Sequence, residues 1–253
     1  MTRYIDTGTK SSIKLLEDVS NFIVNNERQG WIESYATMQR NRLAIDIDLI
    51  QENNIQKEHS ILECGCAPFL LTAAMTSLGY DIQGLDLYPE NFDKTISHFN
   101  LSVSKCDFEI EEIPFGNEFF DVVIFNEVFE HLRINPIFTM SEVLRVLKKG
   151  GILFLSTPNL KSILGIYNFL FRDQAHSCMG GIYTQYKFLE TVGCTGHVRE
   201  YTEREVSDFL NLIGFTKLDC IYRGPNRPRM AQILAKFLDP KLRTFFTIIA
   251  TKK

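Results

Sequence analysis

"ILECGCAPFLL", residues 61–71, is the stretch that decides the fold. Its apolar beginning predicts a buried strand, Gly65 predicts a tight turn, and the apolar residues after the turn predict a helix. In open α/β sheets, ligands lie beyond the carboxyl end of such a strand. A nucleotide-binding turn usually carries three glycines, but Ala67 and Phe69 stand here where the other two would be expected. The stretch therefore raises the question of which ligand this turn can hold.

The composition is that of an ordinary globular chain. It has 253 residues, 45% of them hydrophobic and 23% charged, and a net charge of −4. This acidic balance gives no electrostatic case for a nucleic-acid partner or an anionic membrane. The first ten residues lack the apolar core of a signal peptide, and the longest apolar run, residues 163–171, is too short to span a bilayer. None of the six cysteines forms a CxxC pair, so we expect free thiols, no zinc site and a cytoplasmic protein.

Strands and helices alternate along most of the chain. Apolar strands are predicted at SILECG, DIQGLDL, FFDVVIFNEVF and GILFLSTPN, with helices between them. Three further strands are predicted at LSVSKCDF, TKLDCIYR and LRTFFTIIATKK. This alternation predicts a doubly wound, Rossmann-like α/β sheet of seven strands, mostly parallel with an antiparallel last strand. Residues 1–55 are expected to form a helical segment that covers the ligand site, and residues 56–253 the main domain. A lid-like insertion is expected at about residues 160–196, where the alternation stops.

An acid at the end of the second strand narrows the choice of ligand. Asp86 follows Gly65 by 86 − 65 = 21 residues, and a carboxylate there can accept both hydroxyls of a ribose. A nicotinamide cofactor would need the glycines that this turn lacks, because its pyrophosphate approaches the backbone closely. S-adenosylmethionine carries no phosphate. The start of the helix suits its carboxylate, and Glu63 suits its ammonium group.

Five stretches in order resemble the motifs of class I S-adenosylmethionine-dependent methyltransferases: ILECGCAPFLL, GLDLYPE, CDFE, FFDVVIFNEVFEHL and VLKKGGILFLSTPN. The resemblance covers roughly residues 60–160 and continues in GHVREYTEREVSDFLNLIGF, which is similar to the small-molecule branch with type 11 and type 23 domains. It implies an enzyme with S-adenosylmethionine as its cofactor. It also implies the following cofactor site: Glu63 and Gly65 at the methionine end, Asp86 and Leu87 at the ribose, Cys106, Asp107 and Phe108 at the adenine, and Asn126 near the ammonium group.

Methyl transfer to a hydroxyl requires a base, for which histidine is the usual choice. His131 follows the apolar strand FFDVVIFNEVF and His197 begins HVREYT, so these two are the candidate catalytic residues. In an extended segment His197, Arg199 and Tyr201 would face one side, which makes Arg199 and Tyr201 candidates for binding the acceptor. No cluster with metal-ligand spacing is visible in the sequence, so we expect no metal.

The acceptor is the least determined part of the hypothesis. The STPN strand end, the insertion and HVREYT are similar to methyltransferases of bacterial surface-glycan (capsule polysaccharide) pathways, which favours the hydroxyl of a carbohydrate, a sugar or nucleotide sugar. The alternatives are O- or N-methylation of a quinone or natural product, and a non-catalytic S-adenosylmethionine-binding partner protein, which Phe69 would favour. Arg227 and Arg229 are expected to bind an anionic part of the acceptor, and the insertion could form a homodimer contact.

Overall fold

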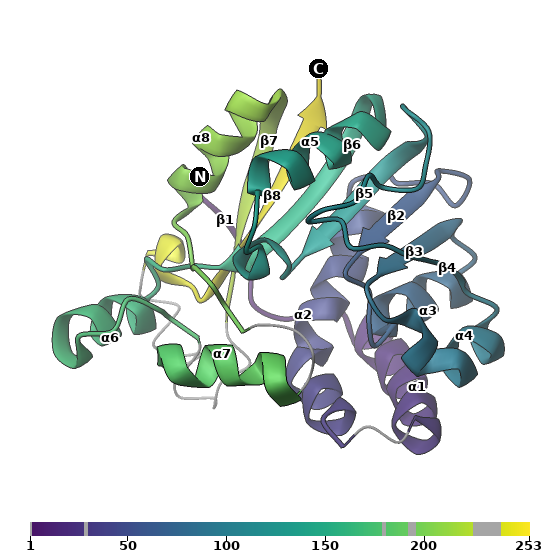
Figure 1. Ribbon diagram of the computed structural model, residues 1–253, viewed down its shortest axis with the longest axis horizontal. Helices are drawn as coiled ribbons and strands as arrows, with labels where there is room; N and C mark the ends of the chain where they lie inside the picture. Colours follow the sequence, from purple (N-terminus) through teal and green to yellow (C-terminus); the bar gives the residue numbers. More distant parts are fainter. Residues whose placement is uncertain (1, 28–29, 179–180, 192–195, 225–238) are drawn as a thin grey trace.

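The computed structural model describes residues 2–27, 30–178, 181–191, 196–224 and 239–253. Within these residues one sheet has eight strands in the order β1-β7-β8-β6-β5-β2-β3-β4 (Figure 1). β8 runs antiparallel to both of its neighbours, and the other neighbouring pairs are parallel. This arrangement confirms the expected doubly wound α/β fold with an antiparallel last strand. The strands are β1 (Arg3–Ile5), β2 (Ile61–Cys64), β3 (Ile82–Asp86), β4 (Ser102–Lys105), β5 (Phe120–Asn126), β6 (Leu147–Pro158), β7 (Phe215–Arg223) and β8 (Phe245–Lys252).

The sheet has one strand more than the seven expected from the sequence. The additional strand, β1, pairs in parallel with β7 at the edge of the sheet, with Arg3 opposite Ile221. It has only three residues and no alternation of buried and exposed side chains, so the sequence carries no strand pattern there. Its Tyr4 ring lies 3.8 Å from the guanidinium carbon of Arg243, a cation–π contact that holds it to the end of the chain. The N-terminal segment is therefore not helical throughout.

Helices cover both faces of the sheet (Figure 1). Successive residues of the central strands point to opposite faces: Ile61 packs in the core that includes α1, α2 and α3, and Leu62 in the core that includes α5 and α8. Burial on both faces is the physical reason for the continuous apolar runs in the sequence. The helices are α1 (Lys10–Asn26), α2 (Ile32–Glu52), α3 (Leu70–Ser77), α4 (Asp93–Phe99), α5 (Pro136–Val146), α6 (Ile163–Arg172), α7 (Ile182–Thr191) and α8 (Glu203–Ile213), with 3₁₀ turns η1 (Pro89–Phe92), η2 (Phe129–His131) and η3 (Pro240–Leu242).

Local signals set the ends of α8. The Thr202 hydroxyl accepts a hydrogen bond from the Glu205 backbone N–H, and the Glu205 carboxylate accepts one from the Thr202 backbone N–H. This capping box is the one that T-x-x-E predicts, and it is confirmed. Gly214, at φ +122°, ends the helix.

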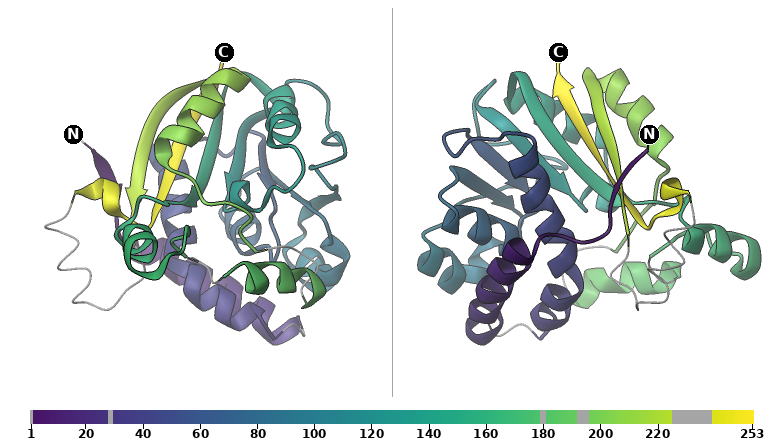
Figure 2. Two further views of the ribbon diagram at one scale, coloured as in Figure 1. Left: turned by 60° about the vertical axis from the view of Figure 1, so that its left-hand side comes forward. Right: turned by 180° about the vertical axis from the view of Figure 1, so that it is seen from behind.

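After β6 the chain leaves the sheet at the carboxyl ends of the parallel strands. α6 and α7 lie there, beyond the sheet and on the same side as the start of α2 (Figures 1 and 2). Many of their large apolar side chains are exposed: Ile163, Ile166, Tyr167, Phe169, Leu170 and Phe171 in α6, and Ile182, Tyr183 and Tyr186 in α7. Among the described helices, none is long and apolar enough to cross a membrane.

An ion pair buried between α2 and β7 ties the N-terminal helices to the sheet. Arg223 Nη1 donates to Asp46 Oδ1, and the two side chains are 1% and 2% exposed. A guanidinium at this depth is costly without its partner, because the interior cannot replace the water it has lost.

We therefore predict that Asp46→Ala lowers the free energy of unfolding by about 3–5 kcal/mol, because it leaves the buried Arg223 with only the more distant Glu127 carboxylate, 3.9 Å from Nη2, among the described residues. Chemical denaturation measures this loss. The matched control is Glu52→Ala, which removes a partner of Arg3 in a pair that is 41% and 51% exposed. The control should cost about 0–1 kcal/mol. Equal small losses in the two variants would contradict the prediction.

Candidate active site

The turn after β2 depends on Gly65. Its φ is +69°, a left-handed conformation that favours glycine. A Cβ added to Gly65 would also lie only 2.7 Å from Cγ2 of Val128. The turn after β2 is therefore packed directly against the segment that follows β5, and this position needs glycine for both reasons.

The two residues that replace the other expected glycines are accommodated differently. The backbone N–H of Ala67 donates to Asp86 Oδ2 at 2.9 Å, so this residue contributes its backbone to the end of β3. Phe69 adopts φ +67° immediately before α3, and its side chain is fully buried. Its ring packs edge-on against Phe92, with centroids 5.3 Å apart. The ring of Phe69 therefore lies in the core and leaves the turn open.

Two acids flank this turn. Asp86 accepts a second hydrogen bond, at Oδ1, from the backbone N–H of Tyr88, and burial raises its pKa above the ordinary value. Glu63 is 8% exposed, and its Oε2 accepts a hydrogen bond from the Thr72 hydroxyl at 2.5 Å. Burial is the main cause that raises the pKa of Glu63, and the charge of Asp46 adds to it. The Thr72 hydrogen bond lowers the pKa, and the net value is about 8. A cation beside Glu63 would restore its charge.

The other residues expected at the cofactor lie at the carboxyl ends of neighbouring strands. Leu87 follows β3 and is half-buried; after β4 come Cys106, which is buried, and Asp107 and Phe108, which are half-buried. The Phe108 ring packs edge-on against Phe125, with centroids 5.8 Å apart. Asn126 is the last residue of β5, and its Oδ1 is buried without a hydrogen-bond partner in the described ranges. The structure thus brings the eight residues to one edge of the sheet, and their roles stay predictions.

A buried positive charge on α2 was not predicted from the sequence. Arg42 is 9% exposed, and its Nη1 lies 3.3 Å from Glu127 Oε1. Its Nε has no hydrogen-bond partner among the described residues, and its charge lowers the pKa of Glu63. A single basic residue on a helix is indistinguishable from a surface charge in sequence. The available signal was RLAIDIDLI, in which Asp46 and Asp48 interrupt an apolar run.

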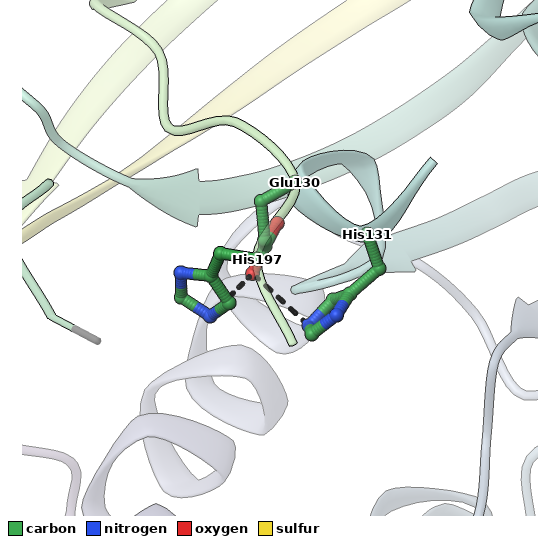
Figure 3. A group of neighbouring side chains, drawn as sticks. All are labelled: Glu130, His131 and His197. Carbon is green, nitrogen blue, oxygen red and sulfur yellow. Dashed lines mark ion pairs between the residues drawn. The ribbon is translucent and has the colours of Figure 1, made fainter. Parts of the chain in front are cut away.

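The two candidate histidines converge on a buried glutamate (Figure 3). Nε2 of His131 and Nε2 of His197 each lie 3.9 Å from Glu130 Oε1, and the ring centroids are 5.0 Å apart. The Glu130 side chain is fully buried. Its Oε2 accepts a hydrogen bond from Thr157 at 2.9 Å, whereas Oε1 has no hydrogen-bond partner in the described chain.

In each imidazole the outer nitrogen, Nδ1, which is the one not facing Glu130, has a hydrogen-bond partner. His131 Nδ1 lies 3.2 Å from the Gly196 carbonyl oxygen, and His197 Nδ1 lies 3.0 Å from Glu200 Oε1. Although burial raises the pKa of Glu200, hydrogen bonds from His197 and Ser177 bring it below its ordinary value. An ionised Glu200 can only accept, so Nδ1 of His197 donates to it and Nε2 faces Glu130. One ligand atom from each of Glu130, His131 and His197 lies within 4.8 Å of the others, a donor set that a metal ion could also use.

The remaining candidates are the four residues expected to bind the acceptor. Arg199 donates to Glu205, and its guanidinium lies 4.8 Å from the centroid of the Tyr201 ring. The Tyr201 ring packs on Phe129, with centroids 4.8 Å apart. These side-chain contacts join Arg199 to Tyr201, and the Arg199 backbone N–H donates to the Glu130 carbonyl at 3.3 Å. Arg227 and Arg229 lie outside the described residues.

A family model described as a methyltransferase domain matches residues 35–219. The chain belongs to this family. The methyltransferase is similar to the ubiquinone biosynthesis O-methyltransferases of Pelagibacter ubique, 32% identical over 106 residues, and of Rattus norvegicus mitochondria, 31% identical over 138 residues. These matches take in 41% and 51% of this chain. They cover 43% and 39% of the two proteins, so the chain spans about two fifths of the length of the curated relatives it matches.

Solved structures share the fold of this methyltransferase. A SAM-dependent methyltransferase from Archaeoglobus fulgidus has a TM-score of 0.61 and 14% identity, covering 88% of this chain and 100% of that chain. Another from Methanosarcina mazei has a TM-score of 0.58 and 17% identity, covering 80% and 96%. Family and fold together imply S-adenosylmethionine as the cofactor. The orphaned Oδ1 of Asn126 and the buried carboxylate of Glu63 fit the ammonium group of that molecule.

The buried carboxyl of Glu63 makes the stability of the ligand-free methyltransferase depend on pH. Its folded pKa of about 8 lies above the ordinary 4.5, so stability falls as pH rises from about 4.5 to about 8. We predict that Glu63→Gln removes this loss. The variant should unfold with a free energy higher by roughly 3–5 kcal/mol above pH 8, and near the wild-type value at pH 5. It should also bind S-adenosylhomocysteine more weakly, because an amide cannot pair with an ammonium group.

Denaturation at the two pH values and calorimetry measure these effects. Glu58→Gln, at an exposed site before β2, is the matched control and should change neither. A Glu63→Gln variant with the same stability difference from wild type at both pH values would show that the carboxyl does not titrate as inferred.

Proposed function

We propose that the protein transfers the methyl group of S-adenosylmethionine to a hydroxyl of a small acceptor. The observation that carries this proposal is the convergence of His131 and His197 on buried Glu130, beside the cofactor turn. The two sites are contiguous, because Val128 packs at the Gly65 position and η2 follows it in the chain. The charges of both Glu63 and Glu130 also act on the Tyr35 hydroxyl, whose pKa burial raises.

The cofactor would be held by the residues at the carboxyl edge. Glu63 would pair with its ammonium group and Arg42 Nε would donate to its carboxylate, while Asp86 would accept from the ribose hydroxyls. Bound there, S-adenosylmethionine supplies a methyl group already activated by a sulfonium. The remaining residues would complete the site: Gly65, Leu87, Cys106, Asp107, Phe108 and Asn126.

His197 is the better candidate for the base. Its Nδ1–H donates to ionised Glu200, so Nε2 is the atom left to take the proton of the acceptor hydroxyl. The imidazolium formed in this way would face Glu130 Oε1, a buried carboxylate oxygen with no hydrogen-bond donor among the residues that the structure describes. His131 would approach the same oxygen from the other side and help to position the hydroxyl. The rest of the task is alignment of the acceptor and exclusion of water.

A quinone-type acceptor is favoured over a sugar. The relatives that match are named for ubiquinone biosynthesis, and the exposed faces of α6 and α7 beyond the site are apolar and aromatic. A sugar or nucleotide sugar rests on the motif resemblance alone, and a dimer contact through the insertion stays a prediction. A non-catalytic binding protein loses its supporting feature, because the ring of Phe69 lies in the core.

Transfer of labelled methyl from S-adenosylmethionine tests the proposal. We predict turnover with phenolic quinone precursors, a lower KM when the precursor carries an apolar substituent, and none with nucleotide sugars. His197→Ala should lose about 10²-fold or more in kcat with cofactor affinity intact, and His131→Ala should lose less. Turnover confined to the sugars would reverse the acceptor assignment. Full activity in both histidine variants would show that neither histidine is the base.

A metal requirement is tested separately, because the sequence lacks ligand spacing but the fold brings Glu130, His131 and His197 together. We predict that dialysis against EDTA leaves turnover unchanged, since the three groups already provide a base and its counter-charge. Zn²⁺ and Mg²⁺ are added back in parallel. Activity that is lost in EDTA and restored by either ion would make the three side chains metal ligands.

A further inference from the structure

Glu200 is a buried carboxylate that binds two separate parts of the chain. Its side chain is 1% exposed. Oε1 accepts from His197 Nδ1 at 3.0 Å and from the backbone N–H of Cys178 at 3.1 Å. Oε2 accepts from the backbone N–H and the hydroxyl of Ser177. One side chain therefore joins the candidate base to the insertion at about residues 160–196.

The residues that Glu200 holds are part of a folded unit built on α6. Asn168 of α6 donates from Nδ2 to the His176 carbonyl at 2.9 Å, and its own carbonyl accepts from the Gln174 N–H at 3.1 Å. A Cβ added to Gly165 of α6 would lie 3.3 Å from the Ser177 Cβ, so helix and turn are in contact. Residues 174–178 thus pack on α6, and Glu200 anchors both to the segment that carries His197.

The other histidine is connected to the second helix of the insertion. The Gly196 N–H donates to the Gln185 carbonyl of α7 at 3.0 Å, and the Gly196 carbonyl lies 3.2 Å from His131 Nδ1. A Cβ added to Gly196 would lie 3.1 Å from the Gln185 Cα, so the two backbones approach each other closely here. Each outer imidazole nitrogen is hydrogen-bonded to a group that is itself bound to the insertion.

We propose that Glu200 is a positioning residue that couples the docking of the insertion to the orientation of His197. This inference rests on the proposed function, in which His197 Nε2 takes the acceptor proton. The Ser177 and Cys178 donors stabilise the ionised form of Glu200, and ionised Glu200 fixes the proton of His197 on Nδ1. When residues 174–178 leave, the carboxylate loses three of its hydrogen bonds and no longer fixes the ring. The base is then assembled only while the insertion covers the carboxyl edge.

The test uses the full chain and three variants, with S-adenosylhomocysteine bound for the ring shifts and the hydrogen exchange, and with S-adenosylmethionine as the substrate for kcat. Glu200→Gln places an amide, with one acceptor and one donor group, where four donors converge. Ser177→Ala removes one hydroxyl donor but leaves Glu200 in place. Asp208→Asn is the matched control, because Asp208 pairs at the surface with Arg204 and its side chain is 66% exposed.

Three measurements separate coupling from a merely structural role: the ¹⁵N chemical shifts of the His197 ring, hydrogen exchange of the 174–178 amides, and kcat against cofactor Kd. In Glu200→Gln we expect a loss of the pure Nδ1–H tautomer and exchange faster by about tenfold or more. We also expect kcat to fall by about 10- to 100-fold with Kd unchanged. Ser177→Ala should change the ring shifts, the exchange rates and kcat in the same direction but by smaller amounts. Asp208→Asn should change none of these quantities.

Faster exchange with an unchanged His197 tautomer and unchanged kcat would overturn the coupling. Where Glu200→Gln fails to fold, Ser177→Ala carries the same comparison. A wild-type protein that methylates no acceptor would defeat the proposed function. The ring shifts and the exchange rates would still decide whether the insertion and His197 are coupled.

Discussion

The burial of carboxylates at the carboxyl edge of the sheet is the constraint on which the site depends. Counted as whole residues, with the backbone, Glu63, Glu130 and Glu200 are 8%, 1% and 3% exposed. A carboxylate removed from water is costly unless it is paired or hydrogen-bonded. Each of the three accepts from one hydroxyl, which Thr72, Thr157 and Ser177 supply in turn. A hydroxyl satisfies a lone pair without neutralising the charge, so this edge is suited to receiving cations.

The three glutamates differ in how far hydrogen bonds and opposite charges compensate their buried carboxyl groups. Glu200 is satisfied within the chain, by His197 and the insertion, and its pKa is lowered despite burial. Among the described residues, the Glu63 carboxyl accepts a hydrogen bond from Thr72 alone, and burial raises its pKa to about 8. Glu130 keeps one oxygen without a hydrogen bond in the described ranges, facing two imidazoles at 3.9 Å. In the proposed function these two glutamates, Glu63 and Glu130, are where positive charge arrives, from the ammonium group of the cofactor at Glu63 and from the protonated base at Glu130.

The sequence predicted the parts of the fold that follow from periodicity. Continuous apolar runs such as FFDVVIFNEVF indicated strands buried on both faces. The position of Asp86 at the end of the second strand indicated that its carboxylate lies at the edge of the sheet where ligands bind. β1 was not predictable, because three residues at a sheet edge carry no period. Arg42 and Glu200 were not predictable either, since their importance comes from burial and from partners far away in the chain. His131 and His197 could each be chosen by position, but their convergence on Glu130 depends on how η2 meets the segment before α8.

The turn after β2 shows why one glycine is sufficient here. Only Gly65 has no room for a Cβ, since Val128 would lie 2.7 Å away. At the next expected glycine, Ala67 contributes a backbone N–H to Asp86, which any residue except proline could do. Phe69 does need a left-handed backbone, and that conformation costs a side-chain-bearing residue about 1–2 kcal/mol. Full burial of an aromatic side chain is worth about 1.5–3 kcal/mol, so placing the Phe69 ring against Phe92 offsets the cost. Phe69 therefore takes a backbone conformation that favours glycine, and the packing of its ring in the core compensates for the strain. Its ring does not lie at the edge of the sheet where the cofactor is expected.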